Sequence, residues 1–281
     1  MITAILLAGG KGKRMHSRLP KVLHEIAGYP LLYYSLKLLS KLPIYDIQVS
    51  LGYKQSLTLR DKQSLTLRDK QSLILANARI KKDTVKSVAL DIGKELNIAK
   101  KLNFVVQYKR LGTGHAVRTT LKYIDPSIED ILVLYGDDSF LYKPETIKRV
   151  LSLHDKSQAD LTFITLRVDD PGGMGRIVHD AEGKVVRIIE EKAATEAQKK
   201  TREVNDGCYV FRTSWIREFI KQIPLSATGE YYLTDLVEIG AKNGAKIETY
   251  TLADTREWFG VNTREQLAQA NQIMKLSRKI K

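Results

Sequence analysis

Two kinds of hydrophobic pattern alternate along the first half of the chain. One is a short apolar run, which suits a strand that helices cover on both faces of a parallel sheet. The other repeats apolar residues every three or four positions, which predicts an amphipathic helix. The expected strands are residues 3–8, 46–51, 103–107 and 131–135, and the expected helices run from Pro30 to near Pro43 and from Asp83 or Thr84 to Leu96. This alternation predicts an α/β fold with a mostly parallel sheet and helices on both faces.

Three polar turns directly follow expected strands. One is a glycine turn at residues 9–12, one is a glycine turn at 112–114 that opens a helix, and one is the acidic pair Asp137 and Asp138. Ligands of open parallel sheets bind beyond the carboxyl ends of the strands. We therefore expect the three turns to line one crevice.

The second half of the chain has a more mixed pattern. Because no Pro- or Ser-rich linker separates the halves, we predict one domain over residues 1–281. The expected elements are strands at 160–167, 204–211 and 247–252, a hairpin of 176–178 with 185–189, helices near 214–222 and 232–242, and a last helix with Thr263 and Gln266 in capping-box spacing.

An octapeptide repeat interrupts the pattern. Residues 55–62 read QSLTLRDK, residues 63–70 repeat this without a change, and residues 71–73 begin a third copy. The period is far below that of solenoid repeats, and the leucine spacing fits neither a helical stripe nor a long strand. We predict a surface insertion at 54–81 without a chemical role.

Composition bounds the class of protein. The chain has 281 residues, of which 43% are hydrophobic, as in soluble globular proteins. Cys208 is the only cysteine, which excludes an internal disulfide and a Cys-rich metal site and fits a reducing compartment. The start of the chain lacks the marks of a secretory leader, and no segment has the length of a spanning helix. We expect a cytoplasmic protein that binds no membrane.

The net charge of +14 is unevenly distributed, because residues 54–110 contribute +9 of it. Aromatic residues are not interleaved with these charges, as stacking on single-stranded nucleic acid would require. We interpret the segment as a solvated basic face and expect no nucleic-acid partner. RNA binding with a steep dependence on salt is the alternative.

The turn at 9–12 combines glycines with cations. Glycine lets the backbone approach a ligand, and cations beside backbone N–H groups favour a polyphosphate. Pro20 fixes the backbone before the last of these cations, Lys21. The cations are Lys11, Lys13, Arg14 and Lys21. Neither the Walker pattern nor a complete G-x-G-x-x-G is present, so an ordinary tight turn stays open at this point.

A polyphosphate loop near a strand-end carboxylate indicates a nucleotide and Mg²⁺. Asp137 with one further oxygen ligand, for which Asn262 is a candidate, would suffice for Mg²⁺. Simpler roles compete with this one: the acidic pair 137–138 caps a turn, His115 makes a structural hydrogen bond, Tyr231 and Tyr232 are packing residues, and Cys208 lies in the core.

The order of motifs over nearly the whole chain resembles the sugar-1-phosphate nucleotidylyltransferases. It is most similar to the uridylyltransferase domain of bacterial bifunctional N-acetylglucosamine-1-phosphate uridylyltransferases. The matching motifs are LAGGKGKRM at 7–15, LPKVLH at 19–24, Gln107, LGTGHA at 111–116, LYGD at 134–137, GRI at 175–177, Glu190, VN at 204–205, GEYYLTD at 229–235 and GVNTR at 260–264.

The resemblance implies a Rossmann-like fold of the nucleotide-diphospho-sugar transferase type, with a mixed, sugar-binding second half. It implies that UTP and N-acetylglucosamine 1-phosphate give UDP-N-acetylglucosamine and pyrophosphate, with Mg²⁺ as cofactor. By position, the nucleotide would be held by Leu7, Ala8, Gly9, Gly10, Lys21, Gln107, Gly112 and Thr113. Catalysis would rest on Arg14, Lys21 and Asp137, and Mg²⁺ would be bound by Asp137 and Asn262. The sugar would be held by Tyr135, Gly136, Gly175, Glu190, Asn205, Tyr232 and Thr234.

The chain departs from the family pattern at several positions, namely Lys13, Asp138–Ser139, Met174 and Asp206. A carboxylate at Asp206, beside the expected sugar pocket, would repel a sugar phosphate or change which sugar is accepted. Two alternatives therefore stay open. The protein uses another sugar 1-phosphate or NTP, or it is a catalytically impaired homologue that binds nucleotides. We expect no acetyltransferase domain, and the oligomeric state is left open.

Overall fold

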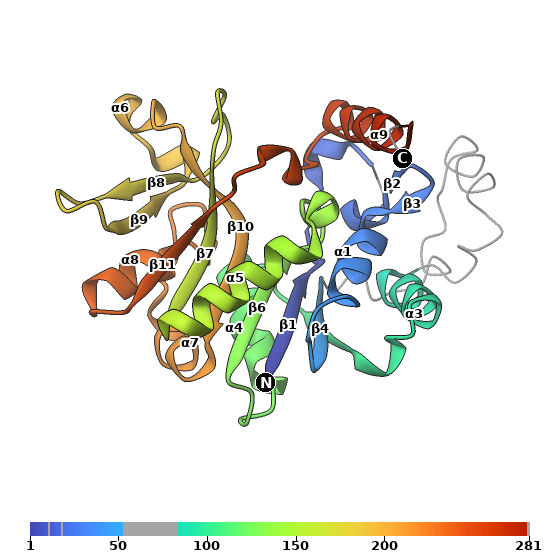
Figure 1. The fold of residues 1–281 in the computed structure, drawn as a ribbon, viewed down its shortest axis with the longest axis horizontal. Coiled ribbons are helices and arrows are strands. Elements are labelled where there is room, and N and C mark those ends of the chain that lie inside the picture. Colours follow the sequence, from blue (N-terminus) through green and yellow to red (C-terminus); the bar gives the residue numbers. More distant parts are fainter. Residues whose placement is uncertain (11, 18, 53–83, 280–281) are drawn as a thin grey trace.

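The computed structural model describes residues 1–10, 12–17, 19–52 and 84–279 (Figure 1). The predicted insertion at 54–81 lies outside these residues, as do Asp83, Lys11 and the side chain of Lys13.

A nine-stranded sheet forms the centre of the described part, and its main path has the order β11-β7-β10-β6-β1-β4-β5. Neighbouring strands on this path are parallel except where β10 pairs with β6 and β7. The strands are β1 (Ile2–Leu7), β4 (Asp46–Gly52), β5 (Leu102–Gln107), β6 (Asp130–Tyr135), β7 (Leu161–Arg167), β10 (Glu203–Arg212) and β11 (Ile247–Thr251). The predicted α/β fold with a mostly parallel sheet is confirmed.

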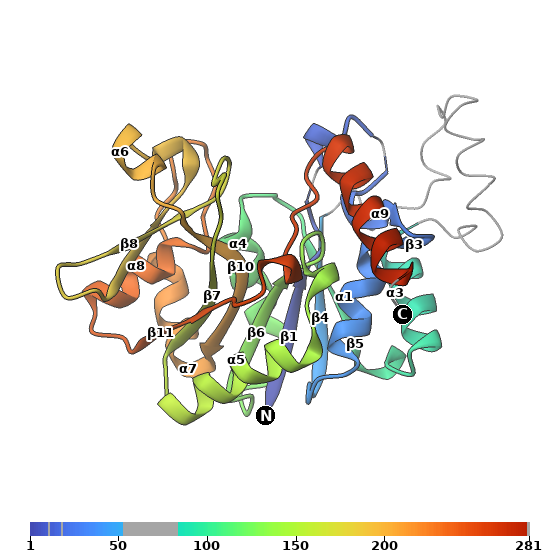
Figure 2. The same cartoon turned by 45° about the horizontal axis from the view of Figure 1, so that its top comes forward.

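Helices cover both faces of this sheet (Figures 1 and 2). Side chains of β1 alternate between two cores, with Ala4 and Leu6 on one face and Ile5 and Leu7 on the other. One core includes side chains from α1 (Leu31–Leu39), α3 (Val85–Glu95) and α5 (Pro144–Ser157). The other includes α4 (Thr113–Thr120), α7 (Thr213–Phe219) and α8 (Asp235–Lys242). A strand buried on both faces explains why the first apolar run has no polar alternation.

The predicted hairpin is present beside the sheet. Strand β8 (Arg176–His179) pairs antiparallel with β9 (Val185–Ile189), and Val204 of β10 pairs with Arg176. The short helix α6 (Glu196–Lys199) follows the hairpin. The helix expected to begin at Asp83 or Thr84 is also confirmed, and Thr84 is its N-cap, because its side chain accepts a hydrogen bond from Ser87 N in a capping box.

The last helix, α9 (Arg264–Lys279), lies beside the small β2–β3 sheet (Glu25–Ile26 and Tyr29–Pro30) in both views (Figures 1 and 2). Apolar side chains from both ends of the chain form a third core there, including Met15, Val261 and Ala270. The segment before α9 is thereby brought to the loop after β1. Within the described residues, no helix has the length and apolar character needed to cross a bilayer.

Candidate functional site

Four side chains from distant parts of the chain meet at the carboxyl edge of the sheet. Lys21 forms an ion pair with Asp137 Oδ2, and its Nζ donates to Asn262 Oδ1 at 2.7 Å. Arg14 Nη2 donates to the same amide oxygen at 2.9 Å. Two of the four sequence-predicted cations, Arg14 and Lys21, and both predicted metal ligands therefore form one connected cluster.

Local structure explains why Lys21 is fixed in this cluster. Pro20, with φ −52°, precedes a short turn in which Val22 and Leu23 are buried. Lys21 is only 8% exposed, and a buried ammonium is tolerated when a carboxylate and further acceptors pair with it. Here the turn fixes the stem of the side chain, while Asp137 and Asn262 fix its head.

Arg264 ties the end of the chain to the loop after β1. Its guanidinium donates to the carbonyl oxygens of Met15 at 2.8 Å and His16 at 2.7 Å. In addition, Val261 N donates to the carbonyl oxygen of Asp137 at 3.2 Å. These bonds hold Asn262 beside Lys21. Sequence reasoning quoted Arg264 within a motif but gave it no task.

The pair of oxygens at this cluster fits a magnesium ion. Asp137 Oδ2 and Asn262 Oδ1 both approach the Lys21 ammonium, so one charged and one neutral oxygen converge on a single cation. Mg²⁺ takes few protein ligands and completes its shell with water and phosphate oxygens. No group of three or more His, Cys, Asp or Glu side chains suited to a metal occurs among the described residues.

Asp206 does not behave as the sequence led us to expect. Its carboxyl is 3% exposed and accepts hydrogen bonds from the Tyr142 hydroxyl at 2.5 Å and from Cys208 N at 2.8 Å. Burial raises its pKa to about 8, so the carboxyl is largely protonated at neutral pH. Buried and largely neutral, it does not present the exposed charge that would repel a sugar phosphate. Cys208 is fully buried in the same core, as predicted.

Asp138 lies next to this buried group. Burial raises its pKa well above the usual range, and its acidic neighbours Asp137 and Asp206 raise it further. Asp138 therefore takes up a proton more readily than a solvent-exposed aspartate does. The acidic pair at the end of β6 thus has two different environments.

The second glycine turn connects two predicted binding segments. Gly112 has φ +93°, and a Cβ there would overlap the backbone of Tyr231. Gly114 N donates to the carbonyl oxygen of Tyr231 at 2.9 Å, and Leu233 N donates to Thr113 Oγ1 at 3.0 Å. The amide of Gly114 is therefore used within the protein rather than offered to a ligand.

Gln107 is anchored beside this turn. Its Nε2 donates to the carbonyl oxygen of Gly112 at 3.2 Å and lies 2.8 Å from His115 Nδ1. Burial, assisted by Arg118, lowers the pKa of His115. A neutral His115 that accepts from Gln107 fits the structural role that we weighed for it. The Tyr231 ring stacks against the His115 ring, and the Arg118 guanidinium is 4.8 Å from the centre of the Tyr231 ring.

The first glycine turn lies over the ends of β1 and β4. Ala8 N donates to the carbonyl oxygen of Ser50 at 2.9 Å, and Gly136 N donates to that of Leu7 at 3.0 Å. Leu7 and Ala8 are 8% and 1% exposed. These two predicted nucleotide residues are therefore buried at the end of β1, and the Ala8 amide and the Leu7 carbonyl oxygen are used within the protein. A Cβ at Gly9 would be 3.2 Å from the amide nitrogen of Gly52, so the loop lies close against β4.

The predicted sugar residues meet between β8, β9, β10 and the loop before α8. Thr234 Oγ1 donates to Glu190 Oε1 at 2.9 Å, and Asn205 N donates to the carbonyl oxygen of Gly175 at 2.9 Å. Burial raises the pKa of Glu190. The ring of Tyr135 lies against Gly207, whose φ of +99° and lack of Cβ make this contact possible.

Arg176, which the sequence indicated only as part of a motif, holds the turn that contains Gly175. It is 2% exposed, and its guanidinium donates to the carbonyl oxygen of Met174 and pairs with Glu191 at 2.6 Å. A buried guanidinium with these partners fixes the turn, because breaking a buried pair is costly.

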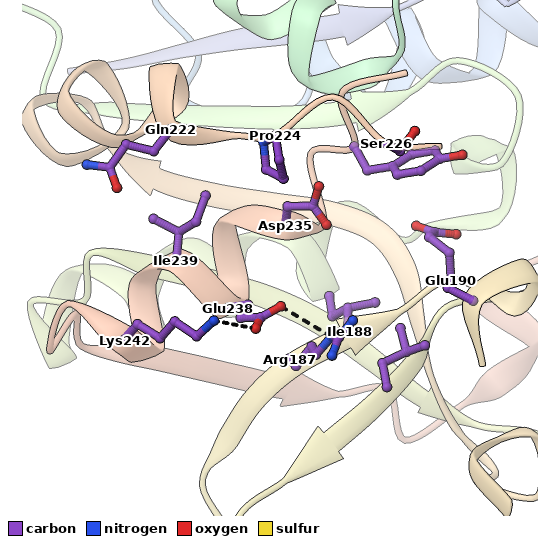
Figure 3. A pocket seen from close by; sticks show the side chains of 13 residues that line it. Arg187, Ile188, Glu190, Gln222, Pro224, Ser226, Asp235, Glu238, Ile239 and Lys242 are labelled. Carbon is purple, nitrogen blue, oxygen red and sulfur yellow. Dashed lines mark hydrogen bonds and ion pairs between the residues drawn. The ribbon is translucent and has the colours of Figure 1, made fainter. Parts of the chain in front are cut away.

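A cavity of about 510 Å³ adjoins the predicted sugar residues, between β9 and α8 (Figure 3). Glu190 lies at one end of it and Gln222 and Lys242 at the other, with Asp235 between them (Figure 3). Tyr232 also lines the cavity, and its hydroxyl is 2.6 Å from Thr228 Oγ1. Burial and the neighbouring Glu190 raise the pKa of Asp235 to about 6.

The fold and this edge cluster together define an α/β protein that handles phosphates. A family model described as nucleotidyl transferase matches residues 3–276. The chain belongs to this family. The match confirms the resemblance that the motifs indicate.

Curated relatives cover the chain almost completely. This chain is 34% identical over 273 residues to a bifunctional protein GlmU of Heliobacterium modesticaldum. The alignment covers 97% of this chain and 52% of that protein. This chain is also 34% identical over 273 residues to the GlmU of Halalkalibacterium halodurans, with the same coverage. The chain therefore spans about half the length of these relatives.

Solved structures share the fold. A putative glucose-1-phosphate thymidylyltransferase from Bacillus anthracis superposes with a TM-score of 0.72 at 19% sequence identity. The superposition covers 97% of this chain and 95% of that chain. A UDP-glucose pyrophosphorylase in complex with UDP-glucose has a TM-score of 0.72 at 21% identity, with coverage of 99% and 100%.

Proposed function

We propose that the chain transfers UMP from UTP to N-acetylglucosamine 1-phosphate, giving UDP-N-acetylglucosamine and pyrophosphate in the cytoplasm. The cluster of Arg14, Lys21, Asp137 and Asn262 carries the proposal, because it gathers cations and oxygen ligands at the carboxyl edge of the sheet. The relatives named GlmU and the pyrophosphorylase fold support a sugar-1-phosphate substrate.

In the proposed reaction an oxygen of the sugar phosphate attacks the α-phosphorus of UTP, and the bond from that phosphorus to the pyrophosphate oxygen breaks. The attacking group is already an anion, so no side chain has to remove a proton from it. Lys21 and Arg14 would stabilise the negative charge that grows on the leaving pyrophosphate. Mg²⁺, held by Asp137 and Asn262, would supply further positive charge to the phosphate oxygens.

The remaining predicted residues would hold the two substrates. The nucleotide would be contacted by Leu7 and Ala8, by the glycines 9, 10 and 112, and by the side chains of Gln107 and Thr113. Glu190 would accept hydrogen bonds from sugar hydroxyls, since Thr234 orients its carboxyl. Tyr135, Gly136, Gly175, Asn205 and Tyr232 would complete the sugar pocket.

A panel of substrates tests this proposal. The full chain is incubated with Mg²⁺, each of UTP, dTTP, CTP, ATP and GTP, and several sugar 1-phosphates, and pyrophosphate release and product mass are measured. We expect the highest kcat/KM with UTP and N-acetylglucosamine 1-phosphate. A higher value with another pair would replace the substrate assignment, and no release with any pair would refute turnover and leave nucleotide binding alone.

A further inference from the structure

One cation at the carboxyl edge has no assigned task. Arg110 follows β5 by three residues, and its side chain folds back over the end of β4, where a Cβ at Gly52 would overlap the guanidinium. Gly52 in turn lies against Gly9 of the first glycine turn. The guanidinium therefore lies between the loop after β1 and the turn after β5.

This guanidinium has no protein partner among the described residues. No hydrogen bond or ion pair joins the Arg110 guanidinium to another described residue, whereas the guanidinium groups of Arg176, Arg212 and Arg217 each have a partner. Arg110 is only partly exposed, and burial lowers its pKa. A partly buried arginine with unused donors is suited to a ligand that brings acceptors.

The order of the strands indicates which part of a nucleotide Arg110 would meet. Along the edge, Asp137 follows β6, the glycine turn follows β1, Gly52 ends β4 and Gln107 ends β5. The Arg14 and Lys21 cluster lies at the β6–β1 end, which suits phosphates. A nucleotide lying along the edge then has its base over β4 and β5, beside Arg110 and Gln107.

The hydrogen bonds of Gln107 indicate which donor and acceptor groups a bound base would need. Both hydrogens of its amide are used, because Nε2 donates to Gly112 O and to the neutral His115 ring. The oxygen Oε1 is therefore the atom that Gln107 presents, and it accepts a hydrogen bond. The Arg110 guanidinium lies where a Cβ of Gly52 would be, and Gly52 pairs with Gln107 across β4 and β5. It can only donate. The protein therefore presents an acceptor, Gln107 Oε1, next to a donor, Arg110. A base that carries a ring N–H next to a carbonyl oxygen matches this pair.

We propose that Arg110 is a base-specificity residue, which donates to a carbonyl oxygen of the base while Gln107 Oε1 accepts from the adjacent ring N–H. Uracil, thymine and guanine carry such an N–H beside a carbonyl. Cytosine and adenine carry a ring nitrogen without hydrogen beside an amino group. The ring nitrogen would place an acceptor against the acceptor Gln107 Oε1, and the amino group would place a donor against the Arg110 donors. This inference rests on the proposed use of the crevice by a nucleotide.

The test compares Arg110→Ala with the matched control Lys109→Ala, in which the neighbouring exposed lysine loses the same charge. KM is measured for UTP and CTP with the best sugar 1-phosphate, together with the thermal midpoint. We expect Arg110→Ala to raise KM for UTP at least about tenfold, to change kcat little and to reduce the preference for UTP over CTP by a similar factor. Lys109→Ala should match the wild type.

Two further variants separate base recognition from charge. Arg110→Lys keeps the charge but loses the planar donor edge, so it should not restore the preference for UTP. Gly52→Ala leaves Arg110 in place but displaces its guanidinium, and should reproduce most of the loss. An equal rise of KM for UTP and CTP in Arg110→Ala would mean that Arg110 contacts phosphate, and it would overturn the inference, as would an unchanged KM.

Calorimetry with UDP and CDP keeps the two proposals apart. If the wild type releases no pyrophosphate with any substrate pair, the proposed reaction fails, yet the difference in affinity between UDP and CDP still reports on Arg110. We expect that difference to shrink in Arg110→Ala. A wild type that binds UDP and CDP equally would refute the base-specificity role.

Discussion

The proposed substrate site has two ends that are built from different interactions, a proposed phosphate end around Lys21 and a proposed sugar end around Glu190. At the phosphate end, opposite charges are already paired, since Lys21 contacts Asp137 and Asn262, and Arg14 contacts Asn262. At the sugar end, Glu190 has a neutral partner, Thr234, and a pKa raised by burial. The phosphate end is organised for charge, and the sugar end for directed hydrogen bonds.

This difference predicts different kinetic consequences. Fixed charges act most strongly where charge develops in the transition state, so losing them lowers kcat. Hydrogen bonds to hydroxyls that do not react contribute similarly to the bound substrate and the transition state, so losing them mainly raises KM.

The largest effect is expected from Lys21→Ala. Loss of the ammonium removes charge stabilisation of the leaving pyrophosphate and leaves Asp137 without its partner, so kcat should fall at least about 100-fold. Steady-state pyrophosphate release measures this. Lys41→Ala, which removes an exposed lysine after α1, is the control and should keep wild-type kcat. A fall of less than about tenfold in Lys21→Ala would show that the phosphate end does not act as proposed.

A smaller effect, at the other end, is expected from Glu190→Gln. The amide keeps the size of the side chain but replaces a charged acceptor by a weaker one, so KM for the sugar phosphate should rise about tenfold while KM for UTP stays unchanged. Initial rates at varied sugar phosphate measure this. The exposed Glu182→Gln in the β8–β9 turn is the control. If Glu190→Gln instead lowered kcat at unchanged KM, the contrast between the ends would be wrong.

Sequence patterns located most of the framework. Apolar runs fixed the positions of β1, β4, β5 and β6, and the polar turns after them meet at one edge as expected. Helix α5 was not anticipated, although Pro144 at its start and the apolar spacing of Ile147, Val150 and Leu151 indicate it.

The contacts of single side chains were harder to predict, because they depend on residues far apart in the chain. Arg264 reaches the carbonyl oxygen of Met15, which precedes it by 249 residues. The irregular pairing of β10 between Asn205 and Tyr209 interrupts the simple alternation of its side chains. The sequence suggested that Asp206 borders the sugar because it directly follows Asn205, whereas its side chain contacts Tyr142 in the core.

The smallest effect on catalysis, and a distinct effect on stability, is expected from Asp206→Asn. Because the Asp206 carboxyl is buried and bonds to the Tyr142 hydroxyl and Cys208 N rather than to a proposed substrate-binding side chain, kcat and KM should change less than about twofold. Its pKa is about 8 in the folded protein against a usual value of 3.8, so between these values the folded chain keeps a proton that the unfolded chain releases. The free energy of unfolding therefore falls as pH rises through this window, by up to about 1.4 kcal/mol per pH unit.

Asparagine cannot release this proton, so the stability of Asp206→Asn relative to the wild type should increase steadily from pH 5 to about pH 8. Thermal or urea unfolding at each pH measures the difference. Asp155→Asn, at an exposed position of α5, should run parallel to the wild type over the same range. Parallel curves for Asp206→Asn would mean that the carboxyl is ionised in the folded protein. Asp206 would then place a negative charge near the sugar end, as the sequence suggested.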